Sequence, residues 1–354
     1  MTARRTDILY LWFCQRLAFF RNQYTIVWVF VESLGRMIVL KKTTDICLLL
    51  WYTVTNDCEQ ARERCPIIHL LINPVAGHGY AKRVATQVIR ALRGKDIPFD
   101  LHYTEYPGHA QLIAQHAADS GADTLIAVGG DGTIFETAQG MLHTKTSLGI
   151  IPAGTGNDFS KSLDIPRKPL SALEHLLTHD ARSVDAGLVN DKMFINVCGT
   201  GFDVMVLEYT ELSKRYVRGI LAYLYGILRA IRKYAPVTLE ITREDGTSET
   251  KSVTIFSIAN GRLFGGGIVI APHADLQDGL LDVMTIGAKS TRQIVACLPK
   301  LLTGRVLQIS DTETHRCREI TVTAPQMHLN VDGEILKMDR AHFRVLPNAL
   351  WVRA

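Results

Sequence analysis

The sequence of 354 residues lacks any Cys-x-x-Cys pair, and its seven cysteines are scattered. Neither a zinc site nor a disulfide framework is therefore indicated, and a reducing compartment is expected. Internal repeats and low-complexity tracts are also absent. No apolar run reaches the roughly 18–20 residues that a membrane-spanning helix needs. A secretory signal is not indicated either, because no small-residue cleavage site follows an apolar core.

A strong charge of either sign is missing as well. The formal net charge is +4 and the pI is about 8.6. This balance is too weakly basic to indicate a nucleic-acid partner. It suits a cytoplasmic protein that binds anions or touches acidic lipid, and the length allows two domains with cores of ordinary size.

Residues 1–65 differ from the rest of the chain. They hold three of the four tryptophans, Trp12, Trp28 and Trp51, in apolar runs that charged residues interrupt. The segment is interpreted as an interfacial membrane anchor, as a packed accessory element, or as sequence from a start codon placed too far upstream. The last interpretation is favoured, because the regular pattern begins at Pro66.

A buried strand, a glycine turn and a helix stand at the centre of the chain. Residues 124–128 are apolar and β-branched, which predicts a buried strand. Gly129-Gly130-Asp131-Gly132-Thr133 follows, and then a helical pattern. Such a turn offers backbone N–H groups and a positive dipole end to a phosphate. Asp131 would repel phosphates unless a cation lay between them, so it indicates Mg²⁺.

Two further strands end in similar loops. Residues 67–72 precede Asn73-Pro74-Val75-Ala76-Gly77, and residues 148–151 precede a loop that continues to Asn157-Asp158-Phe159. Loops at the carboxyl ends of successive parallel strands share one rim of the sheet, which is where open α/β sheets bind ligands.

The order of elements predicts an α/β domain followed by an all-β domain. Strands and helices alternate up to residue 182, which is typical of βαβ units and a largely parallel sheet. From residue 183 most elements are strands joined by turns, which favours an antiparallel β-sandwich. We therefore expect an atypical extension at 1–65, an α/β nucleotide-binding domain at 66–182 and a β-sandwich at 183–354. A return of the last residues as a strand to the first domain is one alternative.

One long helix is expected inside the second domain, over residues 204–233. Its cations and tyrosines, among them Arg229, Arg232, Tyr223 and Tyr225, could rest on an anionic membrane. A packed helix with a solvated cationic face is the favoured interpretation of this pattern.

Two acidic turns complete the candidates. Asp275 and Asp278 lie in a turn before a strand, which suits either a hard cation or a turn closed by aspartate side chains. Asn330-Val331-Asp332-Gly333-Glu334 contains a hairpin signal. On pattern alone Glu334 is a surface glutamate.

Five motifs in order, Asn-Pro-x-x-Gly, Gly-Gly-Asp-Gly-Thr, Gly-Thr-Gly-Asn-Asp-Phe, Asp-x-x-Asp-Gly-x-Leu and Asp-Gly-Glu, resemble the bacterial soluble diacylglycerol kinase and lipid kinase family over residues 66–350. The resemblance implies an N-terminal nucleotide domain like that of NAD kinases and diacylglycerol kinases, a C-terminal β-sandwich and an active site between them. It implies Glu334 as general base and a structural Mg²⁺ at Asp275, Asp278 and Leu280. The residues implied to bind ATP are Asn73, Pro74, Val75, Ala76, Gly77, Thr104, Gly130, Asp131, Gly132, Thr133, Ile134, Phe135, Glu136 and Thr155. Two positions depart from the common pattern: Phe135 replaces a frequent asparagine, and His78 replaces a frequent lysine, which leaves Arg83 and Lys161 as candidate phosphate cations.

The expected function is an ATP- and Mg²⁺-dependent lipid kinase that is cytoplasmic and peripherally associated with the membrane. Diacylglycerol, converted to phosphatidic acid, is the expected acceptor. A sphingoid base, phosphatidylglycerol and an undecaprenyl-type alcohol remain open. An NAD kinase-type enzyme with a soluble substrate and a non-catalytic nucleotide- or lipid-binding module are the alternatives. No nucleic-acid partner is expected, and the oligomeric state is open, with a homodimer among the alternatives.

Overall fold

The computed structural model describes residues 27–31, 36–40, 68–213 and 220–354. The chain divides into two units between Pro66 and Ile67. In the first unit the described strands are β1 (Val27–Val31) and β2 (Arg36–Leu40), which pair antiparallel. The other expectations for residues 1–65, and the cations between 214 and 219, lie outside the described residues.

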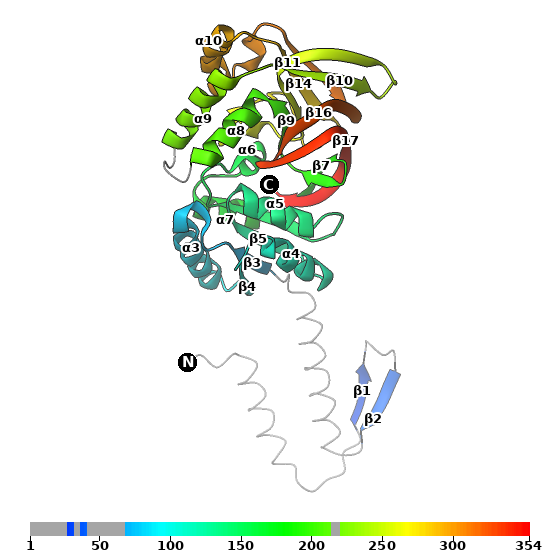
Figure 1. Ribbon diagram of the computed structural model, residues 1–354. Helices are drawn as coiled ribbons and strands as arrows, with labels where there is room; N and C mark the ends of the chain where they lie inside the picture. The colour runs from blue at the N-terminus through cyan, green and yellow to red at the C-terminus, as the bar shows by residue number, and fades with distance from the viewer. Residues whose placement is uncertain (1–26, 32–35, 41–67, 214–219) are drawn as a thin grey trace. The chain divides into compact units, whose positions relative to one another are not determined.

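The second unit begins with a parallel sheet in the order β4-β3-β5-β6, confirming the predicted α/β architecture. Its strands are β3 (Ile68–Ile72), β4 (Phe99–Tyr103), β5 (Thr124–Gly129) and β6 (Ser147–Pro152). The helices are α3 (Tyr80–Gly94), α4 (His109–Asp119), α5 (Asp131–Gly140), the short α6 (Asp158–Ser162) and α7 (Pro169–Thr178). Figure 1 shows α3, α4, α5 and α7 around these strands.

Apolar patterning accounts for these elements. Strands β3, β5 and β6 are buried along their whole length, as expected for parallel strands covered on both faces. Helix α3 buries a stripe of Ala81, Val84, Ala85, Val88 and Leu92 against them. The core of this lobe thus fixes where each strand ends and where its loop begins.

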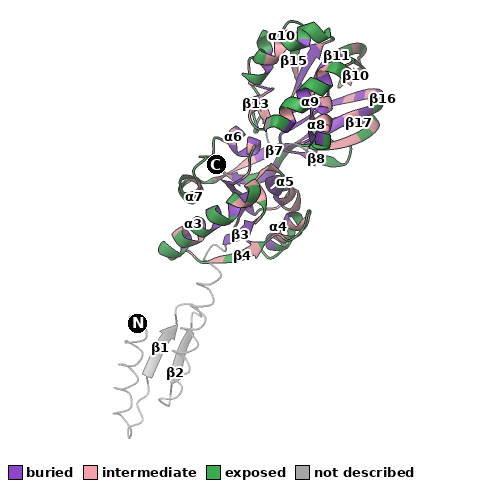
Figure 2. Ribbon diagram, turned by 60° about the vertical axis from the view of Figure 1, so that its left-hand side comes forward, coloured by how far each residue is buried: buried purple, intermediate pink, exposed green. Residues whose placement is uncertain are grey.

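The second lobe is the predicted antiparallel sandwich. Its strands are β7 (Ala181–Val189), β8 (Lys192–Phe194), β9 (Val197–Gly201), β10 (Val237–Arg243), β11 (Ser248–Ala259), β12 (Leu263–Phe264), β13 (Ile268–Val269), β14 (Leu281–Gly287), β15 (Thr312–Cys317), β16 (Glu319–Val331) and β17 (Glu334–Arg353). Phe194 and Phe343 meet edge to face in its core, with ring centroids 6.4 Å apart. The buried strands appear purple in Figure 2.

Three helices cover a second core beside this sandwich. They are α8 (Phe202–Ser213), α9 (Ile220–Lys233) and α10 (Thr291–Leu302). The helical stretch expected over 204–233 contains most of α8 and all of α9, with residues 214–219 outside the described residues, and α10 was not expected. Among the helices of the described residues, none has both the length and the apolar character needed to cross a bilayer.

Strand β17 joins the lobes. Its first part pairs antiparallel with β16, its other edge pairs with β7, and Trp351 and Val352 pair in parallel with Ser147 and Leu148 of β6. Apart from β12 and β13, which form a separate antiparallel pair, the strands of both lobes therefore form one hydrogen-bonded sheet, with β17 between β16 and β6. This continuity holds the carboxyl rim of the parallel strands next to the sandwich (Figure 1).

Candidate active site

A cleft of about 720 Å³ opens at the carboxyl ends of the parallel strands. The loops that follow β3, β4, β5 and β6 all contribute to it. Its walls are Asn73, Pro74, Val75, Ala76, Gly77, Thr104, Glu105, Tyr106, Pro107, Gly130, Asp131, Gly132, Thr133, Glu136, Gly154 and Thr155. This space is called the nucleotide cleft below. It gathers all of the residues predicted to bind ATP except Arg83, Ile134 and Phe135.

Close backbone contacts hold the loops of the nucleotide cleft together. A Cβ on Gly154 would lie 2.4 Å from the Cα of Gly130, so only glycine lets these two loops touch. Asn73 donates a hydrogen bond from Nδ2 to Oγ1 of Thr133 (2.9 Å) and accepts one from the Val75 N–H (3.1 Å). Contacts within the protein thus define the shape of the cleft.

Asp131 begins α5 and fastens two loops to each other. Its carboxylate accepts hydrogen bonds from the backbone N–H groups of Asn157 and Asp158, both at 2.6 Å. Burial raises the pKa of Asp131, the charge of Asp158 raises it further, and the N–H bonds oppose this shift. The neighbouring charge of Asp158 makes a cation beside Asp131 favourable.

Asp158 and Lys161 link the first lobe to the second. Asp158 accepts a hydrogen bond from the Gly266 N–H (2.8 Å), while Lys161 Nζ donates to the Gly266 carbonyl (3.0 Å). Lys161 also lies 3.3 Å from Asp158 Oδ1. The pair therefore closes the junction between α6 and the glycine loop of residues 265–267.

Asp332 fixes the hairpin that carries Glu334. Its carboxylate accepts hydrogen bonds from three consecutive N–H groups, those of Ile195 (2.6 Å), Asn196 (3.0 Å) and Val197 (3.0 Å). Burial nevertheless raises the pKa of Asp332 to about 6, and Asp131 contributes to the increase. The charge of Asp131, in the first lobe, thus raises the pKa of a carboxyl group in the second lobe.

Glu334 is the first residue of β17, opposite Val331, and its side chain is exposed. Within the described part of the chain no hydrogen bond or ion pair holds its carboxylate. The preceding residue, Gly333, lines the cavity described next. Glu334 itself is not among the residues that line that cavity; it directly follows the lining residue Gly333.

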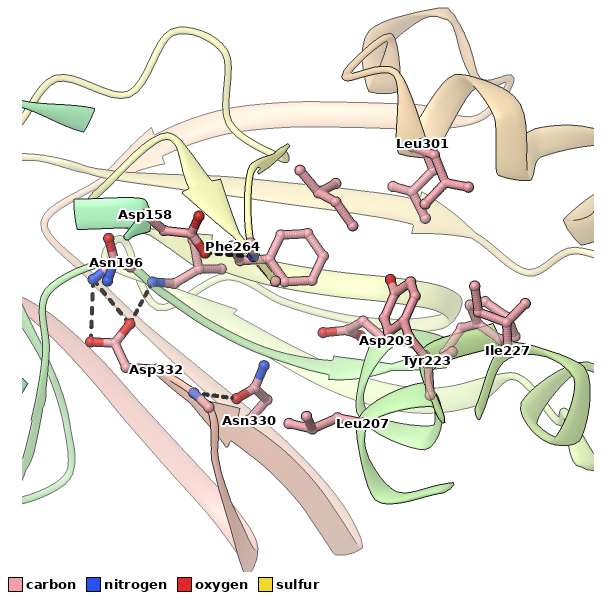
Figure 3. Close-up of a pocket in the computed structure, with 18 of the residues that line it drawn as sticks. Asp158, Asn196, Asp203, Leu207, Tyr223, Ile227, Phe264, Leu301, Asn330 and Asp332 are labelled. Carbon is pink, nitrogen blue, oxygen red and sulfur yellow. Dashed lines mark hydrogen bonds between the residues drawn. The ribbon is translucent and has the colours of Figure 1, made fainter. Parts of the chain in front are cut away.

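A second cavity of about 250 Å³ lies between the lobes and is called the acceptor cavity below. Its polar end is formed by Asp131, Asp158, Asn196, Asn330, Asp332 and Gly333. Its other walls include Phe202, Val206, Leu207, Tyr223, Ile227, Phe264, Ile268, Leu298, Leu301 and Leu302. Figure 3 shows Asp158 and Asp332 at one end and Ile227 and Leu301 at the other. Asp131 lines both this cavity and the nucleotide cleft.

One carboxylate lies among the apolar walls of the acceptor cavity. Asp203, in the first turn of α8, lies beside Tyr223 in Figure 3. Its Oδ1 is buried and has no hydrogen-bond partner among the described residues. Burial raises the pKa of Asp203 to about 6. Burial also raises the pKa of Tyr223, and the charge of Asp203 raises it further. Asp203 is thus suited to contact a polar group of a largely apolar ligand.

Three residues predicted to bind ATP lie away from the nucleotide cleft. Ile134 is buried in the core, and Phe135 packs against that core. Arg83 is exposed on α3, with Cζ 5.6 Å from the ring centroid of Tyr80. Lys161, the other candidate cation, lies between the lobes beside Asp158.

The structure adds site residues that the sequence interpretation did not include. Asp158 and Asp332 belong to two of the five motifs, so acidic residues inside glycine-containing motifs were an available signal. Asn196 and Asp203 have no such signal, because only long-range packing brings them to the cavity. Their side chains were therefore not predictable from local pattern.

The predicted metal turn is closed by protein groups. Asp275 accepts a hydrogen bond from the Gln277 N–H and Asp278 accepts one from the Leu280 N–H, both at 3.0 Å. Arg316 pairs with Asp278 (3.4 Å) and Asp282 (3.3 Å). Within the described residues no three His, Cys, Asp or Glu side chains converge as a metal site. Magnesium binding at this turn stays a prediction.

Known proteins match both lobes. The diacylglycerol kinase catalytic domain model matches residues 68–189, and the YegS C-terminal NAD kinase beta sandwich-like domain model matches residues 196–354. A crystal structure of a diacylglycerol kinase from Bacillus anthracis has a TM-score of 0.63 at 22% identity, covering 82% of this chain and 97% of that one. Because the identity is only 22%, this similarity shows that the two proteins share a fold and nothing further.

Curated relatives match along most of their length. The diacylglycerol kinase of Mycobacterium tuberculosis is 30% identical over 80% of this chain and 93% of its own. The diacylglycerol kinase of Bacillus subtilis is 31% identical over 75% of this chain and 88% of its own. A protein of Pseudomonas aeruginosa named as a probable YegS-like lipid kinase is 36% identical over 69% of this chain and 81% of its own. Together with the two matching lobes, these relatives show that the chain belongs to the diacylglycerol kinase and YegS-like lipid kinase family.

Proposed function

We propose that the protein transfers the γ-phosphoryl group of ATP to the hydroxyl of a lipid alcohol, with diacylglycerol as the expected acceptor and phosphatidic acid as the product. One observation carries this proposal: Asp131 lines both the nucleotide cleft and the acceptor cavity. A phosphate donor and an alcohol acceptor in these two spaces would meet at the same carboxylate.

The nucleotide cleft fits a polyphosphate. Phosphoryl transfer needs positioned N–H groups and positive charge around the transferred group more than covalent chemistry. The glycine turn at the start of α5 would supply the N–H groups. Lys161, at the edge between the lobes, would supply positive charge. Family membership implies ATP as the donor, and the walls of this cleft are consistent with it.

The acidic end of the acceptor cavity fits a divalent cation. Burial, and after it the charge of Asp158, raises the pKa of Asp131, and a cation beside these two carboxylates would stabilise the ionised form of Asp131. Mg²⁺ binds through one or two carboxylates, water and substrate phosphates, so Asp131 and Asp158 would hold it. When bound, Mg²⁺ would neutralise charge that develops on the transferred phosphoryl group.

The acceptor hydroxyl must lose its proton as the new P–O bond forms and the bond to ADP breaks. Three of the nearby carboxylates are engaged: Asp131 and Asp332 accept backbone N–H bonds, and Asp158 binds Gly266 and Lys161. Glu334 is unengaged within the described residues and follows the cavity residue Gly333. We therefore assign proton acceptance to Glu334, a role worth about 10²–10⁴ in rate.

The apolar walls favour an acceptor with hydrocarbon chains. The side chains from α8, α9 and α10 are mostly aliphatic or aromatic, which suits acyl or alkyl chains and disfavours a soluble nucleoside. Such an acceptor resides in a bilayer, so this function requires contact between the protein and a membrane surface.

Transfer from labelled ATP to a panel of lipids in mixed micelles tests the proposal. The panel contains diacylglycerol, a sphingoid base, phosphatidylglycerol and a polyprenyl alcohol, with NAD as a soluble acceptor. We expect Mg²⁺-dependent labelling of a lipid, with diacylglycerol preferred. Labelling of NAD alone would refute the lipid kinase. Thermal stabilisation by Mg-ATP without turnover on any lipid would favour a non-catalytic module.

A matched pair of variants tests the proton acceptor. Glu334→Gln should lower kcat by at least about 100-fold while the Kd for ATP stays unchanged. Glu240→Gln, at an exposed position of β10, should keep normal turnover. Near-normal kcat in Glu334→Gln would show that another group accepts the proton.

A further inference from the structure

The nucleotide cleft carries an exposed aromatic ring that the transfer of a phosphoryl group does not itself require. Tyr106, in the loop between β4 and α4, lines the cleft and is 52% exposed. Its ring is stacked on that of His109, with ring centroids 4.5 Å apart and planes 2° from parallel. Because His109 covers one face, the exposed area of the Tyr106 ring belongs to the other face and the edge. One face of a flat aromatic ring is therefore left for a ligand.

Hydrogen bonds hold the loop that carries these two rings. The Glu105 N–H donates to Nδ1 of His109 (3.2 Å), so Nδ1 carries no proton. The His109 N–H donates to the Tyr106 carbonyl (3.2 Å). The Ala110 N–H donates to Oε2 of Glu136 on α5 (3.3 Å). Since these bonds already fix the loop, a ligand that stacks on Tyr106 loses little affinity to ordering it.

A second exposed apolar group lines the same cleft. Val75, in the loop after β3, is 75% exposed, and its N–H donates to Oδ1 of Asn73 (3.1 Å). Pro74 and Pro107 also line the cleft. The loops after the adjacent strands β3 and β4 thus present apolar side chains to a space whose other walls are polar. Apolar groups in a cleft with a few polar ones are typical of a site for a flat organic ligand.

The order of the strands places Tyr106 away from Asp131. Strand β4 is at the edge of the sheet, and β3 separates it from β5, which ends at the glycine turn. Neighbouring strands lie about 4.8 Å apart, so the loop after β4 is roughly 10 Å from that turn. Asp131 lines the acceptor cavity as well, so the phosphates of ATP belong at its end of the cleft. The nucleoside of an extended ATP molecule would then reach the loop after β4.

We propose that Tyr106, backed by His109, is the platform on which the adenine base of ATP stacks, with Val75 as a further apolar contact. The residues that the family resemblance implies for ATP leave this end of the cleft without an aromatic contact, because their one aromatic member, Phe135, packs against the core. The identity of the nucleotide rests on the proposed function. The platform itself is tested by binding, which requires no turnover.

Isothermal titration calorimetry of the full chain, without lipid, tests the platform. The titrants are Mg-ATP, Mg-CTP and Mg-tripolyphosphate, which has the phosphates but no base. We expect wild type to bind Mg-ATP most tightly, because a purine offers the larger ring for stacking. Tyr106→Ala should weaken the binding of Mg-ATP about 5- to 150-fold, the range for loss of one stack between a base and an aromatic side chain. Its Kd for Mg-tripolyphosphate should equal that of wild type.

Two further variants isolate the contribution of the ring. Tyr106→Phe keeps the ring and should bind Mg-ATP as wild type does. Tyr103→Ala is the matched control: Tyr103 is 48% exposed on β4 and is not among the residues that line the cleft. All three Kd values should be unchanged in this control. Circular dichroism should show the wild-type fold in every variant, because both tyrosines are exposed.

His109 acts in this proposal as a positioning residue for Tyr106. His109→Ala should weaken the binding of Mg-ATP by less than Tyr106→Ala does and leave that of Mg-tripolyphosphate unchanged. Added to Tyr106→Ala, it should have no further effect, because its contribution passes through the Tyr106 ring. Additive losses in the double variant would show that His109 does not act through Tyr106.

Three results would overturn the inference. The first is normal affinity for Mg-ATP in Tyr106→Ala. The second is an equal loss of affinity for Mg-tripolyphosphate, since the effect would then arise at the phosphates. The third is a loss in Tyr106→Phe as large as that in Tyr106→Ala, which would assign the contact to the hydroxyl group instead of the ring.

Two readouts separate this inference from the proposed function. Binding of Mg-ATP that depends on Tyr106, without phosphorylation of any lipid, would retain the platform and refute the kinase. Phosphorylation of diacylglycerol by Tyr106→Ala with an unchanged KM for ATP would retain the kinase and refute the platform.

Discussion

Substitution of Gly132 by alanine should change stability and nucleotide affinity in opposite directions. Gly132 is the second residue of α5 and lines the nucleotide cleft. A Cβ at this position would meet no atom within 4 Å, so the unliganded protein has room for it. Alanine exceeds glycine in helix propensity by up to about 1 kcal/mol. Tm should therefore rise, by about 2–4 °C at most.

The same methyl group would occupy space where a polyphosphate approaches the N–H groups of the turn. Loss of one hydrogen bond to a charged group costs about 1.5–3 kcal/mol, which corresponds to a Kd for ATP that is roughly 10- to 100-fold weaker. Isothermal titration calorimetry with Mg-ATP measures the affinity, and thermal unfolding without nucleotide measures the stability.

Gly94→Ala is the matched control. Gly94 ends α3, and a Cβ there also meets nothing within 4 Å. It is not among the residues that line the nucleotide cleft. This variant should gain stability of a similar size and bind ATP normally. An ATP Kd within threefold of wild type in Gly132→Ala would show that phosphates do not pack over this turn.

Three further substitutions test other parts of the structure. Asp203→Asn removes a carboxyl whose pKa is raised to about 6, so the folded state no longer holds an extra proton between pH 4 and 6. The unfolding free energy of the variant minus that of wild type, measured by urea denaturation, should increase by up to about 3 kcal/mol as pH rises from 4 to 8. A difference that stays constant over this pH range would contradict the prediction. Asp332→Ala leaves three buried N–H groups without their acceptor and should lower the unfolding free energy by about 3 kcal/mol or more; a loss under 1 kcal/mol in the same denaturation would show that these bonds contribute little. Phe343→Leu should cost at least about 1 kcal/mol through its edge-to-face contact with Phe194, without changing the Kd for ATP; calorimetry would expose any effect on the site.

Local patterns were sufficient for the first lobe. Strands β3, β5 and β6 are each a short apolar run followed by a loop that contains glycine, and the stripe from Ala81 to Leu92 identifies α3 and its buried face. Because parallel strands end on one rim, the position of the loops followed from topology. Most of the nucleotide cleft could therefore be predicted from the sequence.

The helices over the sandwich were harder to predict because their patterns were ambiguous. Helix α9 is apolar on two sides, so periodicity could not locate its buried face. Helix α10 was missed although Ser290 and Gln293 form a capping box at its start. The acceptor cavity could not be predicted, because α8, α9, α10 and the Asp332 hairpin meet there only in the folded chain.

Strand β17 has a consequence for how the molecule is assembled. Ser147 and its partner Trp351 are about 200 residues apart in the sequence. During synthesis, one edge of β6 therefore stays unpaired until almost the whole of the second lobe has been made and β17 can pair with it. Pairing between strands so distant in sequence is slow. An uncovered parallel edge invites pairing with other chains. The nascent protein should thus depend on chaperones until β17 emerges, and the first lobe expressed alone should aggregate.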